Sequence, residues 1–248
     1  MPIRLPLLAP EPDAPFPPAG QAHREPNGLL AMGGDLSPAR LLNAYRCGIF
    51  PWFSEGEPIL WWCPDPRMVF FTETFRLPAR MCRQLRQSRW ELRADTAFAD
   101  VIDACAHSPR PGQDGTWITA GMRAAYVELH RLGHAHSLEV FDGERLVGGI
   151  YGVAIGRMFF GESMFSAVPG GSKVALAGLA RLLAGWGWPM IDAQVENPHL
   201  LSLGGQRLAR PAFLAHVARW AAHPLPPGSW AERVLPFPAS TLAVPPPA

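Results

Sequence analysis

The chain has 248 residues, of which 48% are hydrophobic and 10% aromatic, and its net charge is +1. This composition excludes an intrinsically disordered protein and supplies enough apolar surface for one large domain, or for a large and a small one. The net charge by itself does not indicate nucleic-acid binding. The four cysteines are widely spaced and form no CxxC pair. This spacing argues against a zinc ribbon or a disulfide framework and is typical of a reducing compartment.

The N-terminal quarter of the sequence predicts a small domain over residues 1–66 with a proline-rich leader. The first two dozen residues, and the tail from about Pro236, are rich in proline, and we expect both to be poorly ordered. They contain no signal-peptide pattern, and no apolar stretch reaches the length of a membrane span, so we expect a cytoplasmic protein without a membrane partner. Ser37 can cap a helix that has Pro38 at its first position and continues to Tyr45.

After Pro66 the pattern changes to alternating strands and helices, which we assign to a second domain over residues 67–248. Asp142-Gly143 between two strand-like runs favours a type I′ hairpin, and Ser172 is the predicted cap of a long helix. Strands are predicted at 67–71, 136–141, 145–153, 157–161 and 189–193, and helices at 78–87, 97–106, 119–132, 172–186 and 210–222. Antiparallel strands flanked by helices indicate an α/β or α+β domain.

The predicted helix at 78–87 and its flanks are rich in arginine and contain no acid. Massed charge of one sign creates a local positive field even on a nearly neutral protein, which suits a nucleic acid. A solvated helix face is the alternative. The arginines of this run are Arg76, Arg80, Arg83, Arg86 and Arg89.

Other patterns give weaker indications of chemistry. His130, His134 and His136 fall at a helix end, in a turn and in a strand, so they do not share a face and we expect no metal site. Lys173 follows Gly170-Gly171-Ser172 at a helix N-terminus, which can bind an anion or can be an ordinary helix start. The elbow pattern of serine hydrolases is absent around Ser163 and Ser166.

Polar residues in two apolar segments are better candidates. Asp192 and Gln194 alternate with apolar residues on a predicted strand, so we expect both side chains on one face. Burying them unpaired costs about 1–3 kcal/mol each, which indicates either a functional pair or a structural hydrogen-bonded one. Glu162 stands among Phe159, Phe160, Met164 and Phe165, and therefore needs a cationic or hydrogen-bonding partner.

Several tryptophans lie in loop-like sequence near proline or glycine. Trp52 and Trp117 can stack on unpaired bases, an interaction worth roughly 1–3 kcal/mol per base. Burial in the core is the alternative, and it is the interpretation we adopt for Trp61 and Trp62.

Dispersed segments, taken together, resemble the leucyl/phenylalanyl-tRNA–protein transferase family. They follow one another in order from about residue 24 to residue 203 and read GLLAMGGDLSPARLLNAYRCGIFPWF, ILWWCPDPR, GTWIT, LGHAHSLEVF, LVGGIYGVA, FFGESMFS and MIDAQVEN. The resemblance implies a small N-terminal domain and a C-terminal domain of acetyltransferase (GNAT) type, with no cofactor and no metal. It also implies transfer of Leu or Phe, and less readily Met, from aminoacyl-tRNA to proteins with N-terminal Arg or Lys, which marks them for degradation. We expect a monomer.

Residue roles follow from the same resemblance, position by position. Asp192 and Gln194 match the pair assigned to catalysis, and Asn197 matches a nearby polar position. Trp52 and Trp117 match positions that hold the 3′-terminal adenosine. The wall of the pocket for the transferred side chain corresponds to Phe159, Glu162, Met164 and Ser166, with Ile150 where the family pattern has a methionine. The tRNA acceptor stem would contact Arg76, Arg80, Arg83 and Arg86.

The residues suggest a mechanism based on alignment. An amide oxygen is a very poor base, so we expect Gln194 to orient the attacking amine, and Asp192 to orient Gln194. Glu162 and Asp192 would supply negative charge for the basic acceptor. Two rival classes remain, an acetyl-CoA-dependent N-acyltransferase and a non-catalytic RNA-binding module. The sequence lacks the pyrophosphate-binding loop that an acetyl-CoA-dependent enzyme would need. An RNA-binding module would not need Asp192 and Gln194.

Overall fold

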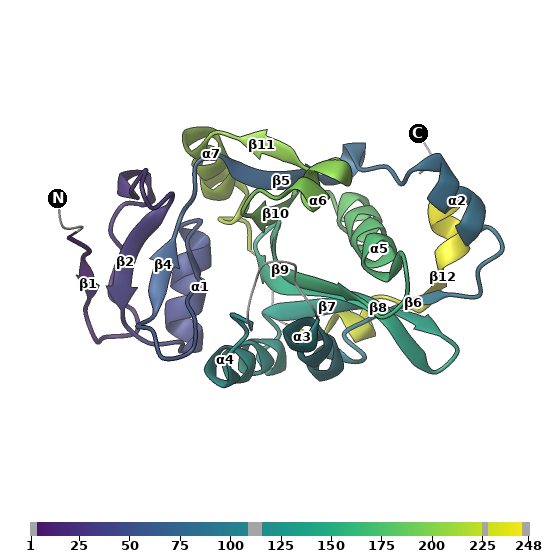
Figure 1. The fold of residues 1–248 in the computed structure, drawn as a ribbon, viewed down its shortest axis with the longest axis horizontal. Helices are drawn as coiled ribbons and strands as arrows, with labels where there is room; N and C mark the ends of the chain where they lie inside the picture. The colour runs from purple at the N-terminus through teal and green to yellow at the C-terminus, as the bar shows by residue number, and fades with distance from the viewer. Residues whose placement is uncertain (1–3, 109–115, 225–227, 245–248) are drawn as a thin grey trace.

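The computed structural model describes residues 4–108, 116–224 and 228–244. The N-terminal part forms a four-stranded sheet with the order β1-β2-β4-β3 and one helix against it (Figure 1). The expected cap of this helix is confirmed, since the Ser37 hydroxyl accepts from the backbone N–H of Arg40 and Pro38 opens the helix. The elements are β1 (Leu7–Leu8), β2 (Leu29–Gly33), α1 (Pro38–Arg46), β3 (Phe50–Pro51) and β4 (Leu60–Trp62).

Residues from Arg67 onward form a second, eight-stranded mixed sheet with the order β11-β5-β10-β9-β8-β7-β6-β12. Its strands are β5 (Arg67–Phe71), β6 (Glu91–Ala94), β7 (Ala135–Asp142), β8 (Arg145–Ile155), β9 (Met158–Ser166), β10 (Met190–Gln194), β11 (Gln206–Leu208) and β12 (Phe237–Pro238). Its helices are α2 (Ala79–Leu85), α3 (Phe98–His107), α4 (Ala120–Arg131), α5 (Gly171–Gly185), α6 (Pro198–Ser202) and α7 (Arg210–Trp220).

The centre of this sheet combines an antiparallel meander with one parallel crossover. Strands β7, β8 and β9 pair antiparallel, and α5 then carries the chain to β10, which pairs parallel to β9. Residues of α3 and α4 pack in one apolar cluster and residues of α5 in another, so helices cover both faces of the meander (Figure 1). The expected mixed α/β fold, with helices on both faces of a mixed sheet, is confirmed. No helix among the described residues combines the length and apolar character needed to cross a bilayer.

Two local predictions are wrong in detail. Asp142 pairs with Arg145, so the hairpin loop is Gly143-Glu144, and of these two only Gly143 has a positive φ, of 61°. This is the pattern of a type II′ turn, in which only the first central residue requires that conformation. The long helix α5 begins after Gly170, which has a φ of 97°, and Ser172 lies inside its first turn.

The proline-rich ends are more ordered than the sequence indicates. In the leader, the Phe16 ring packs edge-on against Trp61, and the buried guanidinium of Arg40 donates to the carbonyl oxygens of residues 9 and 11. In the tail, Phe237 pairs with β6 and Ala239 is buried. Tertiary contacts therefore fix segments whose composition alone predicts disorder. Residues 1–3 and 245–248 lie outside the described part of the chain.

Candidate active site

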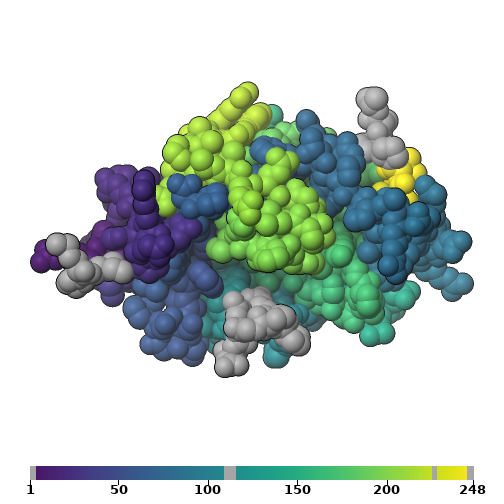
Figure 2. Space-filling view, turned by 45° about the horizontal axis from the view of Figure 1, so that its top comes forward, coloured from purple at the N-terminus to yellow at the C-terminus, as the bar shows by residue number. Residues whose placement is uncertain are grey.

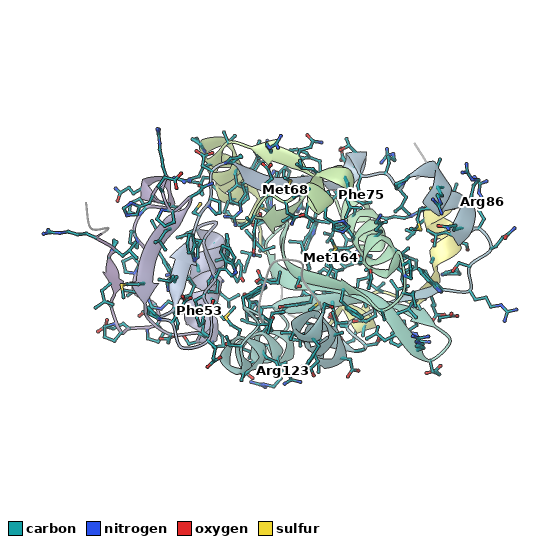
Figure 3. The ribbon with its side chains drawn as sticks, viewed as in Figure 1. Phe53, Met68, Phe75, Arg86, Arg123 and Met164 are labelled. Atoms are coloured by element: carbon teal, nitrogen blue, oxygen red, sulfur yellow. The ribbon has the colours of Figure 1, made fainter. Side chains whose placement is uncertain are left out.

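A cavity of about 890 Å³ opens between the N-terminal sheet and the carboxyl end of β10. Its walls come from β3, β5, β8, β9 and β10, from the loop that carries Trp117, and from α5 and α6. In Figure 3, Met164 marks the middle of the molecule and Phe53 the side of the N-terminal domain. The side chains used below are Trp52, Phe70, Trp117, Ile150, Glu162, Met164, Leu176, Asp192, Gln194 and Asn197. The cavity therefore brings together most of the residues that the sequence singled out.

Asp192 is held by an arginine that the sequence patterns did not reveal. Arg67 of β5 donates from Nε to Oδ1 at 2.8 Å and from Nη2 to Oδ2 at 2.7 Å, and both side chains are 0% exposed. The guanidinium lies 4.7 Å from the Phe50 ring centre and 4.4 Å from that of Phe213. A carboxylate paired in this way has its charge compensated inside the protein. The signal that could have found Arg67 is a charged residue in an otherwise apolar strand.

Gln194 does not share a simple strand face with Asp192, contrary to expectation. The pairing of β10 with β5 shifts register between the two residues, and Gln194 has a φ of 60°. Its backbone N–H donates to Asp192 Oδ1 at 2.9 Å. Its side-chain Nε2 donates to Glu162 Oε1 at 2.7 Å. The bulge thus aims the amide at Glu162, and the carboxylate of Asp192 fixes the backbone of this residue.

Glu162 is half-buried and satisfied by hydrogen bonds, as its apolar surroundings predict. The hydroxyl of Tyr45 from α1 donates to Oε1 at 2.7 Å, and that of Tyr126 from α4 donates to Oε2 at 2.8 Å. Burial raises the pKa of Glu162 to about 7, although these donors and Gln194 act in the opposite direction. The sequence patterns revealed neither tyrosine. The chain has three tyrosines, and Tyr45, Tyr126 and Tyr151 are all 0% exposed, a usage that points to specific buried roles.

The apolar wall of the cavity includes Ile150 and Met164, which face each other across the β8–β9 pair. Trp52 and Trp117 line the same cavity and are half-buried. The Trp52 ring lies 5.5 Å from that of Trp62, which donates from Nε1 to the Trp52 carbonyl at 2.7 Å. Trp61 is buried in the core, as expected. The cavity is therefore lined by aromatic and aliphatic groups around one polar corner.

Of three other predicted residues, two lie outside the cavity lining and one lies within it. Phe159 is fully buried in the cluster under α5 and is not among the lining residues. Ser166 also lies outside the lining, and its Oγ accepts from the backbone N–H of Ser172 at 2.8 Å, which caps α5 from the neighbouring strand. Asn197 lines the cavity, and its side chain accepts from Leu200 N–H at the start of α6.

The arginine run lies away from the cavity. Arg76, Arg80, Arg83 and Arg86 are exposed on and beside α2 and do not contribute to the lining. Figure 3 places Arg86 at the end of the molecule opposite the N-terminal domain. On the face turned forward in Figure 2, green residues of the C-terminal half lie against the purple N-terminal part. The structure thus separates a compact cavity from a distant basic surface.

Two of the three histidines that could have suggested a metal make hydrogen bonds and ring stacks with protein groups. His136 bonds through Nδ1 to Asp95 at 2.8 Å and stacks on Trp230 at 4.1 Å. His130 stacks on Phe98 at 4.2 Å.

A mixed sheet with a β9–α5–β10 crossover, and a cavity that holds an amide and an acid against an apolar wall, are suited to an enzyme of acyl transfer. The sequence model described as leucyl/phenylalanyl-tRNA protein transferase matches residues 69–218, and that of its N-terminal domain matches residues 34–65. A leucyl/phenylalanyl-tRNA–protein transferase of Xanthomonas euvesicatoria pv. vesicatoria is 71% identical over 94% of this chain and 93% of its own length. One from Xylella fastidiosa is 63% identical over 90% and 92%.

The chain belongs to the leucyl/phenylalanyl-tRNA–protein transferase family, and it is an aminoacyltransferase. Among solved structures, L-PGS from Bacillus licheniformis is similar at 11% identity with a TM-score of 0.39, covering 68% of this chain and 54% of that one.

Proposed function

We propose that this aminoacyltransferase moves Leu or Phe, and less readily Met, from tRNA to the α-amine of proteins that begin with Arg or Lys, which marks them for N-degron degradation. The observation that carries the proposal is the Gln194–Glu162 hydrogen bond at the polar corner of an otherwise apolar cavity. The amide is suited to align an amine, the acid to attract a basic side chain, and the wall to accept an apolar amino acid.

The donor would enter with its 3′ adenosine between Trp52 and Trp117, since aromatic rings suit stacking on an unpaired base. Its amino acid side chain would then lie against Ile150 and Met164. Phe70 and Leu176 complete this apolar surface, which offers no polar partner to a hydrophilic side chain. Burial of a Leu or Phe side chain is worth about 1.5–3 kcal/mol, so the wall supports preference for large apolar groups.

The basic surface of α2 would bind the acceptor stem of the tRNA. Its exposed arginines lie outside the cavity and can contact phosphates without occupying the site of reaction. Phosphate contacts position a nucleic acid and carry no sequence information, which fits an enzyme that accepts tRNAs of different sequence.

Transfer would proceed by alignment, because an aminoacyl ester is already activated. The side-chain Nε2 of Gln194 donates to Glu162. The side-chain oxygen of Gln194 is then oriented as the acceptor of this amide. That oxygen can accept a hydrogen bond from the α-amine, whose pKa is roughly 7.7–8, so a useful fraction is neutral at pH 7. Holding the amine against the carbonyl carbon can lower the barrier by several kcal/mol, about 7–11 at most. The amine attacks that carbon, the bond to the tRNA ribose oxygen breaks, and the proton leaves through water or a tRNA hydroxyl.

Glu162 would attract the basic side chain of the acceptor. Asp192 was expected to share this task, but its carboxylate is fully buried and paired with Arg67. It would instead hold the backbone of Gln194 in place. The charge that recognises Arg or Lys is therefore assigned to Glu162 alone.

A single assay tests this function against its rivals. The enzyme is mixed with labelled Phe-tRNA and a peptide that begins with Arg, and label is sought in the peptide, with an Ala-started peptide as control. We expect efficient transfer to the Arg-started peptide only. Consumption of acetyl-CoA without transfer from tRNA would favour the N-acyltransferase, and tRNA binding without transfer would favour the RNA-binding module. We further expect a monomeric cytoplasmic enzyme, and sedimentation in the presence of tRNA can check that it is monomeric.

A further inference from the structure

The polar corner of the cavity contains more close oxygen pairs than the two tyrosines have protons for. Tyr45 Oη lies 2.7 Å from Glu162 Oε1, Tyr126 Oη lies 2.8 Å from Glu162 Oε2, and the two hydroxyl oxygens lie 2.5 Å from each other. These three pairs close a ring, which we call the Tyr–Tyr–Glu ring. Each pair needs one proton between its oxygens, because two oxygens without a shared proton repel each other at such a distance.

Two hydroxyls supply two protons, so an ionised Glu162 leaves one oxygen pair of the ring without a proton. A protonated Glu162 supplies the third. Its Oε2–H then donates to Tyr126, Tyr126 donates to Tyr45, and Tyr45 donates to Oε1, which also accepts from Gln194 Nε2. Every donor and acceptor of the ring is then satisfied. The geometry of the ring therefore matches the neutral acid.

The surroundings of Glu162 favour the same state. Tyr45 comes from α1, Tyr126 from α4, and the fully buried Tyr151 of β8 packs edge-on against Tyr126 at 5.7 Å. The charged groups that face the acid from the sheet are Asp192 of β10 and Arg67 of β5, and they neutralise each other. No cation in this set is left to hold Glu162 ionised, and burial raises its pKa to about 7.

The ring can also accept the ionised acid when a cation arrives. Both hydroxyls then donate to the carboxylate, and only the hydrogen bond between the two tyrosines is broken. We propose that Glu162 carries a proton in the empty enzyme, that the basic side chain of the acceptor displaces this proton to solvent on binding, and that Tyr45 and Tyr126 are positioning residues that make both states of the acid accessible.

This inference rests on the proposed function, because it assumes a basic acceptor. It explains how a half-buried acid can serve a cationic substrate without a permanent unpaired charge in the empty site. An uncharged acceptor side chain has no means of displacing the proton, so the ring would make discrimination between basic and neutral N-termini depend on pH.

The first test compares two peptides that differ only in their first residue, arginine in one and citrulline, its neutral isostere, in the other. The kcat/KM for each is measured with saturating Phe-tRNA from pH 5.5 to 8.5. Titration of the α-amine affects both peptides and cancels in the ratio of arginine to citrulline. With Glu162 titrating near pH 7, we expect the ratio to fall roughly 30-fold between pH 8.5 and pH 5.5, since the ionised fraction drops about tenfold per pH unit below the pKa.

Glu162→Gln should give a low ratio that does not depend on pH. Tyr45→Phe removes a donor to the ionised acid, so the inflection should move to higher pH, and Tyr126→Phe should act in the same direction. The matched control is Glu139→Gln on β7. Glu139 is likewise buried with its pKa raised to about 7, but it bonds to Ser137 and Thr96 and does not line the cavity. This variant should retain the wild-type profile.

A second measurement needs no tRNA and no activity. In enzyme labelled at the side-chain carboxyl carbon of glutamate, NMR should detect a carboxyl that titrates near pH 7, disappears in Glu162→Gln and persists in Glu139→Gln. An excess of the Arg-started peptide should shift this titration below about pH 6, and the citrulline peptide should not.

A flat ratio in an enzyme that transfers efficiently to the Arg-started peptide would overturn the inference and leave the proposed function intact. If the pH inflection of the ratio were unchanged in Tyr45→Phe, the tyrosines would have no role in the protonation of Glu162. Failure of transfer to either peptide would instead overturn the function, and the NMR titration would still report the protonation of Glu162.

Discussion

Arg67 and Asp192 form a bidentate ion pair, with Nε–Oδ1 at 2.8 Å and Nη2–Oδ2 at 2.7 Å, although neither side chain is exposed to solvent. One residue comes from β5 and the other from β10, neighbours in the large sheet. The pair therefore connects the first strand of this sheet to the strand that carries Gln194. The position of Gln194 therefore depends on Arg67, although Arg67 itself does not line the cavity.

Arg67→Ala leaves Asp192 buried without its partner, and we expect the free energy of unfolding to fall by about 3–5 kcal/mol. Arg123→Ala is the control, because Arg123 and Asp103 form a pair of similar geometry at side-chain exposures of 42% and 41%. Its removal should cost no more than about 1 kcal/mol. Urea denaturation measures both variants, and equal effects would contradict the importance assigned to burial.

Gln194→Ala should reduce kcat/KM by about 10²-fold with little effect on folding, because an aligning group is removed from a preorganised site. Gln194→Glu is more informative. It places a second carboxylate at the position whose Nε2 now lies 2.7 Å from Glu162 Oε1, so the two acids would share a proton. We expect this variant to be as impaired as the alanine one at pH 7.

If Gln194→Glu instead transferred efficiently with a pH–rate profile that follows the new carboxyl, Gln194 would act as more than an orienting group. The measurement is single-turnover transfer from Phe-tRNA between pH 5.5 and 8.5.

Ile150→Met exchanges a stiff β-branched residue of the cavity wall for a flexible one. We expect discrimination among Leu-, Phe- and Met-tRNA to relax by up to about tenfold, the scale on which apolar pockets distinguish similar side chains. Ile155→Met is the matched control, since Ile155 is also on β8 and also 5% exposed but does not line the cavity. Competition between the three donors gives the ratios, and equal changes in both variants would exclude a specific role for Ile150.

Glu139 should make stability depend on pH. Burial raises its pKa in the folded protein to about 7, whereas the unfolded value is about 4.3. The folded state thus binds the proton more tightly, and this stabilisation is complete below about pH 4 and is lost as pH rises through 7. Glu139→Gln removes the dependence, so the variant should gain on the order of 1–3 kcal/mol relative to wild type between pH 5 and pH 8. Urea midpoints at the two pH values test this, and a constant difference would refute it.

Arg80→Ala and Arg83→Ala on α2 should weaken tRNA binding and lower its salt dependence by about one unit of slope for each phosphate that the variant no longer neutralises. The control is Arg131→Ala on α4, an exposed arginine paired with Glu128. Filter binding of Phe-tRNA from 50 to 200 mM salt gives the slopes. The basic surface would not be where tRNA binds if all three variants behaved alike.

Sequence patterns predicted most of the fold because its elements carry local signals. Ser37-Pro38 starts α1, and β7 and β8 form the expected hairpin. The errors arise where distant contacts override local preference. Gly170 replaces Ser172 at the start of α5, where the Oγ of Ser166, at the end of β9, accepts from the Ser172 N–H. Composition predicted disorder for the leader, which instead supplies carbonyl partners to the buried Arg40.

The site was predictable only in part, for a similar reason. The need of Glu162 for partners follows from its apolar neighbours, but Tyr45 and Tyr126 lie on separate helices far away in sequence. Strand periodicity predicted that Asp192 and Gln194 share one face. The bulge between them prevents this, and no local sequence pattern predicts that bulge. Arg67 could be suspected from its position in an apolar strand, but its partner could not.

The left-handed backbone of Gln194 has a practical consequence. A φ of 60° is uncommon for residues other than glycine, and strain of about 1–3 kcal/mol is typical of such positions. Gln194→Gly would relieve that strain, so selection for heat resistance alone would favour it. The same exchange deletes the amide that faces Glu162. When this enzyme is engineered for thermostability, Gln194 should therefore be left unchanged, although its backbone conformation would favour glycine.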